Sequence, residues 1–223
     1  MTDQGKLRVN ETVTVSTLWD SPRKAKACYV LAHGAGAGMS HAFMQSVATA
    51  LAERQIATLR FQFPYMEKGS KRTDPPKLCH ATIRAAVSLA REKTDVPLIA
   101  GGRSFGGRMA SQAQAEEPLT GVVGLAFLGF PLHPPKAPSD ERAEHLDDVK
   151  IPMLFLQGTR DELADLTMLK ALAKRLGKRA TLKLYEDGDH SFHVRARSGH
   201  TDAEVFEAMM NDLAAWADNI SAS

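Results

Sequence analysis

Short apolar runs alternate along this chain with stretches of helical periodicity, and this alternation restricts the fold more than any other feature. In the segment from His41 to Gln55, for example, Phe43, Val47 and Leu51 recur at helical spacing. The strand candidates on either side of such segments are CYVLAHG, ATLRFQF, PLIAGG, GVVGLAFLGF, PMLFLQG and TLKLYE. Runs that are apolar without interruption are typical of parallel strands covered on both faces. The pattern therefore predicts an α/β fold with a mostly parallel sheet and right-handed crossovers.

The length of 223 residues suits one domain, because a single hydrophobic core grows up to roughly 250 residues. We expect residues 1–223 to form that domain without a large lid domain, since the alternation uses nearly all of the chain. Between Leu7 and Trp19, apolar and polar residues alternate, which predicts an edge strand or a hairpin. The proline-broken segments 63–77 and 131–145 fit neither a helix nor a strand. Both follow strands, so we expect them at the rim of a pocket, the alternative being surface loops without a role.

The charge balance and the cysteines exclude several classes of protein. Lys and Arg total 28 against 26 for Asp and Glu, and a formal net charge of +2 is too small to indicate a nucleic-acid or membrane partner. No apolar run approaches the length of a membrane helix, which is about eighteen residues, and the first ten residues lack the apolar stretch of a signal peptide. Both observations predict a cytoplasmic protein. Cys28 and Cys79 lie in no metal-binding spacing and are expected to be reduced thiols. We expect a small-molecule partner, and the oligomeric state is not indicated.

The segment GGRSFGGRMA carries the strongest chemical signal, because Gly102 to Gly106 match the pattern G-x-S-x-G. The match follows an apolar strand and opens a helical segment, which is the context of a nucleophile elbow. So abrupt a turn strains the backbone at Ser104, and glycines two positions on either side remove side chains that would collide. Backbone N–H groups at the helix start also favour negative charge. Ser104 is therefore predicted to be a nucleophile, the alternative being a serine that caps the helix.

A serine hydroxyl needs a base, and the elbow predicts the chain order serine, acid, histidine. Asp161 follows the strand PMLFLQG and His190 follows the strand TLKLYE, so the order fits and both would open on the edge of the sheet that holds Ser104. His193 is the nearest rival base, but it lies further from the strand and closer to the last helix. Other acids lie nearby, among which Asp165 falls inside the predicted helix: Glu162, Asp165, Asp187 and Asp189.

The glycine-rich loop HGAGAG, residues 33–38, also follows an apolar strand. Such a loop supplies the second backbone N–H group that stabilises the oxyanion of acyl transfer. We assign the two donors to Phe105 and Ala35, with Gly36 as the alternate to Ala35.

Nucleotide, metal and other cofactor sites find no support. A dinucleotide fingerprint would need glycine where Met39 or His41 stands, and a P-loop would need Lys and Ser or Thr where Arg108 and Met109 stand. His190 and His193 have the spacing of an H-x-x-H metal pair, but no third ligand cluster accompanies them. We therefore expect no cofactor and no metal.

Five ordered segments resemble the α/β-hydrolase superfamily, and more narrowly its dienelactone-hydrolase-related branch. They are LAHGAGAGMSHAFM, RFQFPYMEKG, GGRSFGGRMAS, QGTRDELA and GDHSFHV, and they look like a small group related to a mammalian testis-expressed protein. The resemblance implies a three-layer αβα sandwich with a twisted sheet, and Ser104, Asp161 and His190 as a catalytic triad. It implies no particular substrate.

The resulting hypothesis is a serine hydrolase that cleaves a small ester, thioester or related acyl substrate through an acyl-enzyme. Basic residues in the first proline-broken segment favour anionic substrates: Lys68, Lys71, Arg72 and Lys77. The alternative is a non-catalytic binding or scaffolding protein that retains the fold. All three triad residues are present, which favours the enzyme. Acyl transfer and peptide cleavage use the same triad and are not separated by the sequence.

Overall fold

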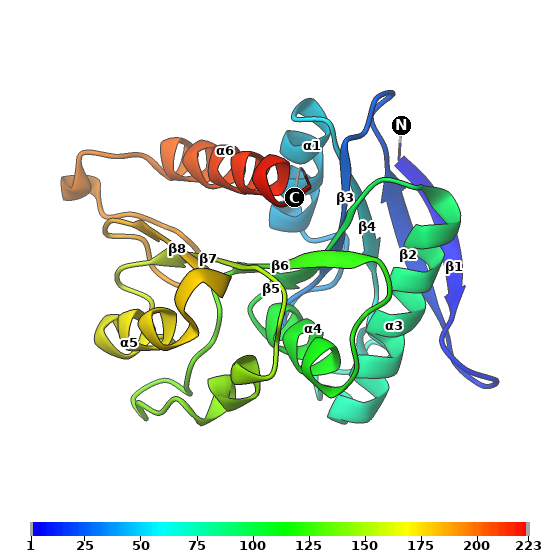
Figure 1. Ribbon diagram of the computed structural model, residues 1–223, viewed down its shortest axis with the longest axis horizontal. Coiled ribbons are helices and arrows are strands. Elements are labelled where there is room, and N and C mark those ends of the chain that lie inside the picture. The colour runs from blue at the N-terminus through cyan, green and yellow to red at the C-terminus, as the bar shows by residue number, and fades with distance from the viewer. Residues whose placement is uncertain (1, 222–223) are drawn as a thin grey trace.

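An eight-stranded sheet organises the computed structural model, which describes residues 2–221 (Figure 1). The strands are β1 (Thr2–Arg8), β2 (Thr14–Asp20), β3 (Ala27–Ala32), β4 (Ile56–Phe61), β5 (Leu98–Arg103), β6 (Val122–Leu128), β7 (Met153–Gly158) and β8 (Ala180–Tyr185). The helices are α1 (Ala42–Glu53), α2 (Pro64–Glu67), α3 (Pro76–Lys93), α4 (Phe105–Glu116), α5 (Leu166–Leu176) and α6 (Asp202–Ser221). The strand order is β1-β2-β4-β3-β5-β6-β7-β8, and every neighbouring pair from β4 to β8 is parallel.

Helices cover both faces of the sheet, with α1 and α6 on one side and α3, α4 and α5 on the other (Figure 1). Successive residues of a strand point to opposite faces, so the inner strands are largely apolar, and the buried Arg60 of β4 is paired with Asp20. In β3, Cys28, Val30 and Ala32 belong to the core beneath α3 to α5, whereas the alternate residues belong to the core beneath α1 and α6. The predicted three-layer, mostly parallel fold is confirmed, and residues 2–221 include no lid domain.

The amino-terminal alternation forms a hairpin, as predicted. β1 pairs antiparallel with β2, and β2 pairs antiparallel with β4. β1 begins at Thr2, five residues before the first apolar residue of the pattern, and within it only Leu7 is buried. β1 lies at the edge of the sheet, and most of its residues contact solvent. The alternation of apolar and polar residues therefore covers only the last part of this strand.

Two local expectations are wrong. The segment 63–77 contains the short helix α2, in which Pro64 occupies the first helical position, where its missing N–H group costs nothing. A 3-10 helix over residues 141–147 begins inside the segment 131–145. Asp165 does not lie inside α5 but caps it, because its Oδ1 accepts the N–H of Met168 at 2.9 Å.

Among the described helices, none combines the length and apolar character needed to cross a membrane.

Candidate active site

Ser104 lies between β5 and α4, on the sharp turn that the motif predicts. Its backbone has φ of +49° and ψ of −116°, a region that residues other than glycine rarely adopt and that costs about 1–3 kcal/mol. A Cβ atom on Gly102 would lie 2.1 Å from the carbonyl oxygen of Ala32, and one on Gly106 would lie 2.5 Å from that of His33. Both glycines are therefore required by the close approach of β3 to the turn.

Ser104, His190 and Asp161 form one continuous chain of hydrogen bonds. The Oγ of Ser104 lies 2.8 Å from Nε2 of His190, and Nδ1 of His190 lies 2.7 Å from Oδ2 of Asp161. The carboxylate is fully buried, whereas the imidazole is 24% exposed. The histidine can therefore reach a bound molecule while the aspartate contacts only protein.

Two further donors fix the orientation of the Asp161 carboxylate. Oδ1 accepts the N–H of Leu163 at 2.8 Å, and Oδ2 accepts a hydrogen bond from the amide of Gln157 as well as the one from His190. Gln157 is itself held, because its Oε1 accepts the N–H of Phe130 at 2.9 Å. We did not predict this role for Gln157, although a glutamine at the end of the apolar run PMLFLQG was a usable signal.

The rival residues have other partners. The exposed ring of His193 is hydrogen-bonded to Oδ2 of Asp202 through its Nδ1, at 2.7 Å. Residues 186–195 form the loop that carries His190, which we call the histidine loop. Asp189 shapes this loop, because its Oδ1 accepts the N–H groups of Ser191 and His193. The described structure therefore brings His190, and not His193, to Ser104.

Arg103 ties the elbow to the histidine loop. Its Nη2 donates to Oγ of Ser191 at 3.0 Å, and its guanidinium carbon lies 4.5 Å from the centre of the Phe43 ring. Burial lowers the pKa of Arg103, and the charges of Asp161 and Asp189 oppose that shift. We predicted no role for this position, although an arginine between an apolar strand and the serine was the available signal.

The loop 33–38 passes beside the serine, since a Cβ atom on Gly34 would lie 3.9 Å from the Cβ of Ser104. Among the hydrogen bonds of residues 2–221, none is donated by the N–H groups of Ala35, Gly36 or Phe105. Unpaired N–H groups beside a nucleophile are the arrangement that binds a developing oxyanion. Both Ala35 and Gly36 fit that role together with Phe105.

A cavity of about 350 Å³ opens at this edge of the sheet. It is lined by residues 34–37, Arg103, Ser104, His190 and Ser191, with His41 and Met44 at the start of α1. Its lining includes no residue of the segments 63–77 and 131–145, whose place at a pocket rim stays a prediction.

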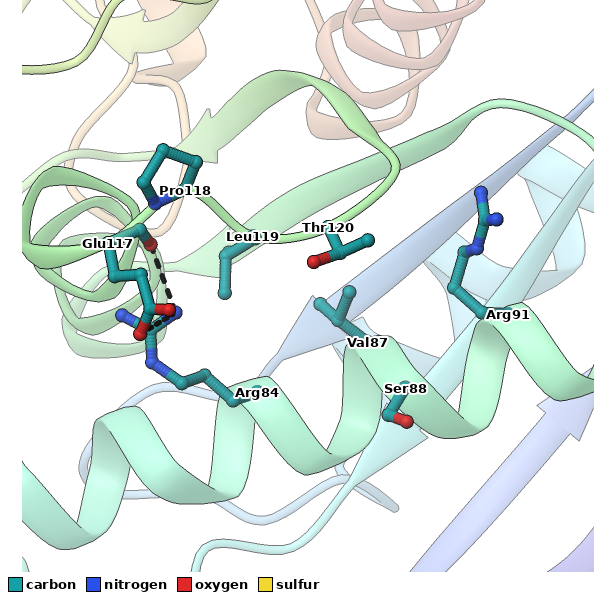
Figure 2. Close-up of a pocket in the computed structure, with 8 residues that line it drawn as sticks. All are labelled: Arg84, Val87, Ser88, Arg91, Glu117, Pro118, Leu119 and Thr120. Atoms are coloured by element: carbon teal, nitrogen blue, oxygen red, sulfur yellow. Dashed lines mark hydrogen bonds and ion pairs between the residues drawn. The ribbon is translucent and has the colours of Figure 1, made fainter.

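A second cavity, of about 390 Å³, lies between α3 and residues 117–120 (Figure 2). It is close to the start of β6, whereas Ser104 follows the end of the parallel strand β5, so the two cavities lie at opposite edges of the sheet. Ser88 and Thr120 bring hydroxyl groups to it, but its described lining contains no histidine that could serve as a base. The cavity at Ser104 is therefore the candidate active site.

Ser111 and His145 form another serine–histidine pair, with Oγ and Nε2 2.7 Å apart. Ser111 is fully buried within α4, and burial together with the charge of Arg108 lowers the pKa of His145 to about 4. A hydroxyl that no substrate can reach is not a nucleophile, so this pair is structural.

A strained serine turn at the carboxyl edge of the parallel sheet, within a three-layer αβα sandwich, defines the α/β-hydrolase class of fold. The chain belongs to this family, because the family model described as "Alpha/beta hydrolase domain" matches residues 25–218. Solved structures with the same fold include a dienelactone hydrolase from Anabaena variabilis, with 21% identity, a TM-score of 0.78 and coverage of 97% of this chain and 96% of that one. A lidless α/β serine hydrolase from Xanthomonas campestris has 20% identity, a TM-score of 0.75 and coverage of 96% and 94%. Est1E from Butyrivibrio proteoclasticus, with ferulic acid bound, has 18% identity, a TM-score of 0.72 and coverage of 94% and 97%.

Proposed function

We propose that this chain is a serine hydrolase that cleaves a small ester, thioester or related acyl substrate, with Ser104, His190 and Asp161 as its triad. The observation that carries the proposal is the hydrogen-bonded chain from Ser104 Oγ through His190 to the buried Asp161 carboxylate. A serine in that arrangement is a competent nucleophile, because the imidazole can accept its proton as it attacks.

The first half of the reaction forms an acyl-enzyme. Nε2 of His190 takes the proton of Ser104 while Oγ bonds to the acyl carbon, and Asp161 stabilises the imidazolium that results. The negative oxygen of the tetrahedral intermediate accepts hydrogen bonds from the N–H groups of Phe105 and Ala35, with Gly36 as the alternate. When the intermediate collapses, the bond to the leaving alcohol or thiol breaks, and His190 returns the proton to that leaving group.

The second half releases the product. A water molecule loses a proton to His190 and attacks the acyl carbon, and the oxyanion uses the same N–H groups. The bond to Ser104 then breaks, Oγ recovers its proton from the histidine, and the carboxylic acid leaves. Each step uses only groups of this chain, water and substrate.

The size and charge of the cavity support a small, anionic substrate. The volume of about 350 Å³ suits a short acyl chain. The cation on its lining is Arg103, which forms no ion pair among the described residues. Arg103 therefore adds support to our prediction that the protein prefers anionic substrates. That prediction rests also on the basic residues of the segment 63–77, which are Lys68, Lys71, Arg72 and Lys77. The narrower kinship to the group related to a testis-expressed protein and a cytoplasmic location remain predictions.

An acyl-chain-length series of p-nitrophenyl esters and matching thioesters tests the function, with Ser104→Ala as the deficient variant. Ser111→Ala is the matched control, because it removes a serine that also contacts a histidine but is buried. We expect turnover that Ser104→Ala abolishes and Ser111→Ala retains, and faster turnover of a hemisuccinate ester than of the neutral butyrate. Full activity in Ser104→Ala contradicts the hydrolase, and equal turnover of the two esters contradicts the anionic preference. A stable partner complex unaffected by Ser104→Ala, without turnover of any ester, would favour a scaffolding protein.

A further inference from the structure

The loop 33–38, which we call the oxyanion loop, is held by buried side chains that do not line the cavity. Ala35 and Gly36 are exposed, whereas His33 is fully buried and Tyr65 almost so. Nδ1 of His33 lies 2.7 Å from the carbonyl oxygen of Gly34, and the hydroxyl of Tyr65 lies 3.0 Å from that of Ala35. The carbonyl groups of Gly34 and Ala35 therefore face buried protein donors, and residues 34–37 line the cavity.

The tautomer of His33 follows from its contacts. Its Nε2 accepts the N–H of Phe63 at 3.0 Å, so Nδ1 carries the proton and donates to Gly34. Burial lowers the pKa of His33 to about 4, and the ring is neutral near pH 7. Burial also raises the pKa of Tyr65, whose hydroxyl therefore stays protonated and can donate.

A carbonyl group and the N–H group of the next residue lie in one peptide plane and, in a trans peptide, point in opposite directions. All peptide bonds of residues 2–221 are trans. Fixing the carbonyl of Gly34 therefore fixes the N–H of Ala35, and fixing the carbonyl of Ala35 fixes the N–H of Gly36. The N–H of Ala35 is thus oriented by His33 and also by the Tyr65 hydroxyl, which lies 3.4 Å from the carbonyl oxygen of Gly34, whereas the N–H of Gly36 is oriented by Tyr65.

Resting on the proposed hydrolase function, we propose that Tyr65 is a positioning residue for the oxyanion site. Its hydroxyl contacts the carbonyl oxygens of Ala35 and Gly34 and so holds the N–H groups of Gly36 and Ala35 toward the cavity. Tyr65 also contacts the other half of that site, since its ring packs edge-on against Phe105 with the ring centres 6.3 Å apart. The residue itself is absent from the lining of the cavity, so it acts through the backbone and not on the substrate.

The segment around Tyr65 is built to hold the side chain in place. Oδ2 of Asp74 accepts the N–H of Tyr65 at 2.8 Å, which closes the loop that follows α2. The Tyr65 ring stacks on Phe63, with an interplanar angle of 16° and centres 6.2 Å apart. Removal of the hydroxyl alone therefore leaves the ring packing in place and isolates the hydrogen bond.

The test compares Tyr65→Phe with Tyr29→Phe. The Tyr29 hydroxyl is also buried and also donates to a backbone carbonyl, that of Ala126, at 2.8 Å, but in the sheet core. Removing an oxyanion donor costs about 10²–10³ in kcat, and Tyr65→Phe loosens a donor without removing it, so we expect a loss of about tenfold in kcat with KM unchanged. Tyr29→Phe should lower Tm and leave kcat unchanged, because it affects folding and not the reaction.

A trifluoromethyl ketone inhibitor supplies a second readout that a purely structural role would not change. Addition of Ser104 Oγ to its carbonyl carbon, with the proton passing to His190, forms an oxyanion, whereas the matching methyl ketone binds largely without addition. Tyr65→Phe should bind the fluorinated ketone about tenfold more weakly and the methyl ketone as well as wild type. Unchanged kcat and unchanged fluoroketone affinity, or losses no larger than those of Tyr29→Phe, overturn the role of Tyr65 alone. Absence of Ser104-dependent turnover in the wild-type protein overturns the hydrolase and the role of Tyr65 together.

Discussion

Asp161→Asn is the perturbation whose outcome follows most directly from the geometry of the site. The carboxylate accepts three hydrogen bonds, one at Oδ1 from Leu163 and two at Oδ2 from Gln157 and His190. An asparagine has one oxygen, so its NH₂ group must face at least one of these donors. Gln157 cannot turn to accept without losing the bond from Phe130 to its own oxygen.

Both placements of the amide impair the base. If the NH₂ group takes the place of Oδ1, it opposes the Leu163 N–H, and His190 keeps a neutral partner that stabilises the imidazolium less. If it takes the place of Oδ2, His190 must accept at Nδ1, and its Nε2–H then points at Ser104 and cannot take the proton. The corresponding change in a Ser-His-Asp protease lowers kcat about 10⁴-fold, or about 5.5 kcal/mol of transition-state stabilisation, and we expect a similar loss here.

The assay is the steady-state hydrolysis of a p-nitrophenyl ester across pH, together with thermal unfolding. KM should change little, because the Asp161 side chain is fully buried and touches no substrate. Asp165→Asn is the matched control, since asparagine caps a helix as well as aspartate does, and it should keep both kcat and Tm. A folded Asp161→Asn variant with kcat within tenfold of wild type would refute the assigned role of this carboxylate.

Three further predictions concern the supports of the site. Gly106→Ala should lower the free energy of unfolding by about 2 kcal/mol in urea titrations, because the clash with the His33 carbonyl outweighs the gain of about 1 kcal/mol in helix propensity; an unchanged midpoint would contradict the close approach. The pKa of His33 is lowered from 6.5 to about 4, so the unfolded chain binds more protons between those values and stability falls as the pH drops, by about 2 kcal/mol at pH 5 from this group. Urea titrations at pH 7 and pH 5 should show that loss, and a His33→Asn variant should show less of it; equal losses would refute the assignment. Arg103→Met should lower kcat several-fold for neutral esters by freeing the histidine loop, and Ser191→Ala should do so to a smaller extent, whereas unaltered kcat in both would show that the loop is held by other contacts.

The sheet and the proximity of Ser104, Asp161 and His190 could be predicted because both depend on regular patterns. Continuous apolar runs mark the parallel strands, and a residue just past the end of such a strand has to lie at one edge of the sheet. Ser104, Asp161 and His190 all satisfy that condition, and they lie within hydrogen-bond distance of one another in the order serine, histidine, aspartate. Their catalytic roles stay predictions until turnover is measured.

The contacts that support the site could not be predicted, because they depend on loop conformations that leave no periodic signal. Phe192 has φ of +63° in the histidine loop, which is a left-handed backbone conformation that the sequence does not predict for a phenylalanine. The bond from Tyr65 to the Ala35 carbonyl joins the short helix α2 to a loop thirty residues earlier in the chain. The sequence does not predict α2, because Pro64, which begins this helix, is equally typical of irregular structure.

The central claim is that Ser104 is a nucleophile that becomes acylated. Intact-mass measurement after brief mixing with a fluorophosphonate, followed by peptide mapping, tests it most directly. We predict one adduct per chain, on the peptide that contains Ser104, with no adduct in Ser104→Ala and a normal one in Ser111→Ala. An unlabelled wild-type protein, or an adduct that survives Ser104→Ala, would contradict the claim.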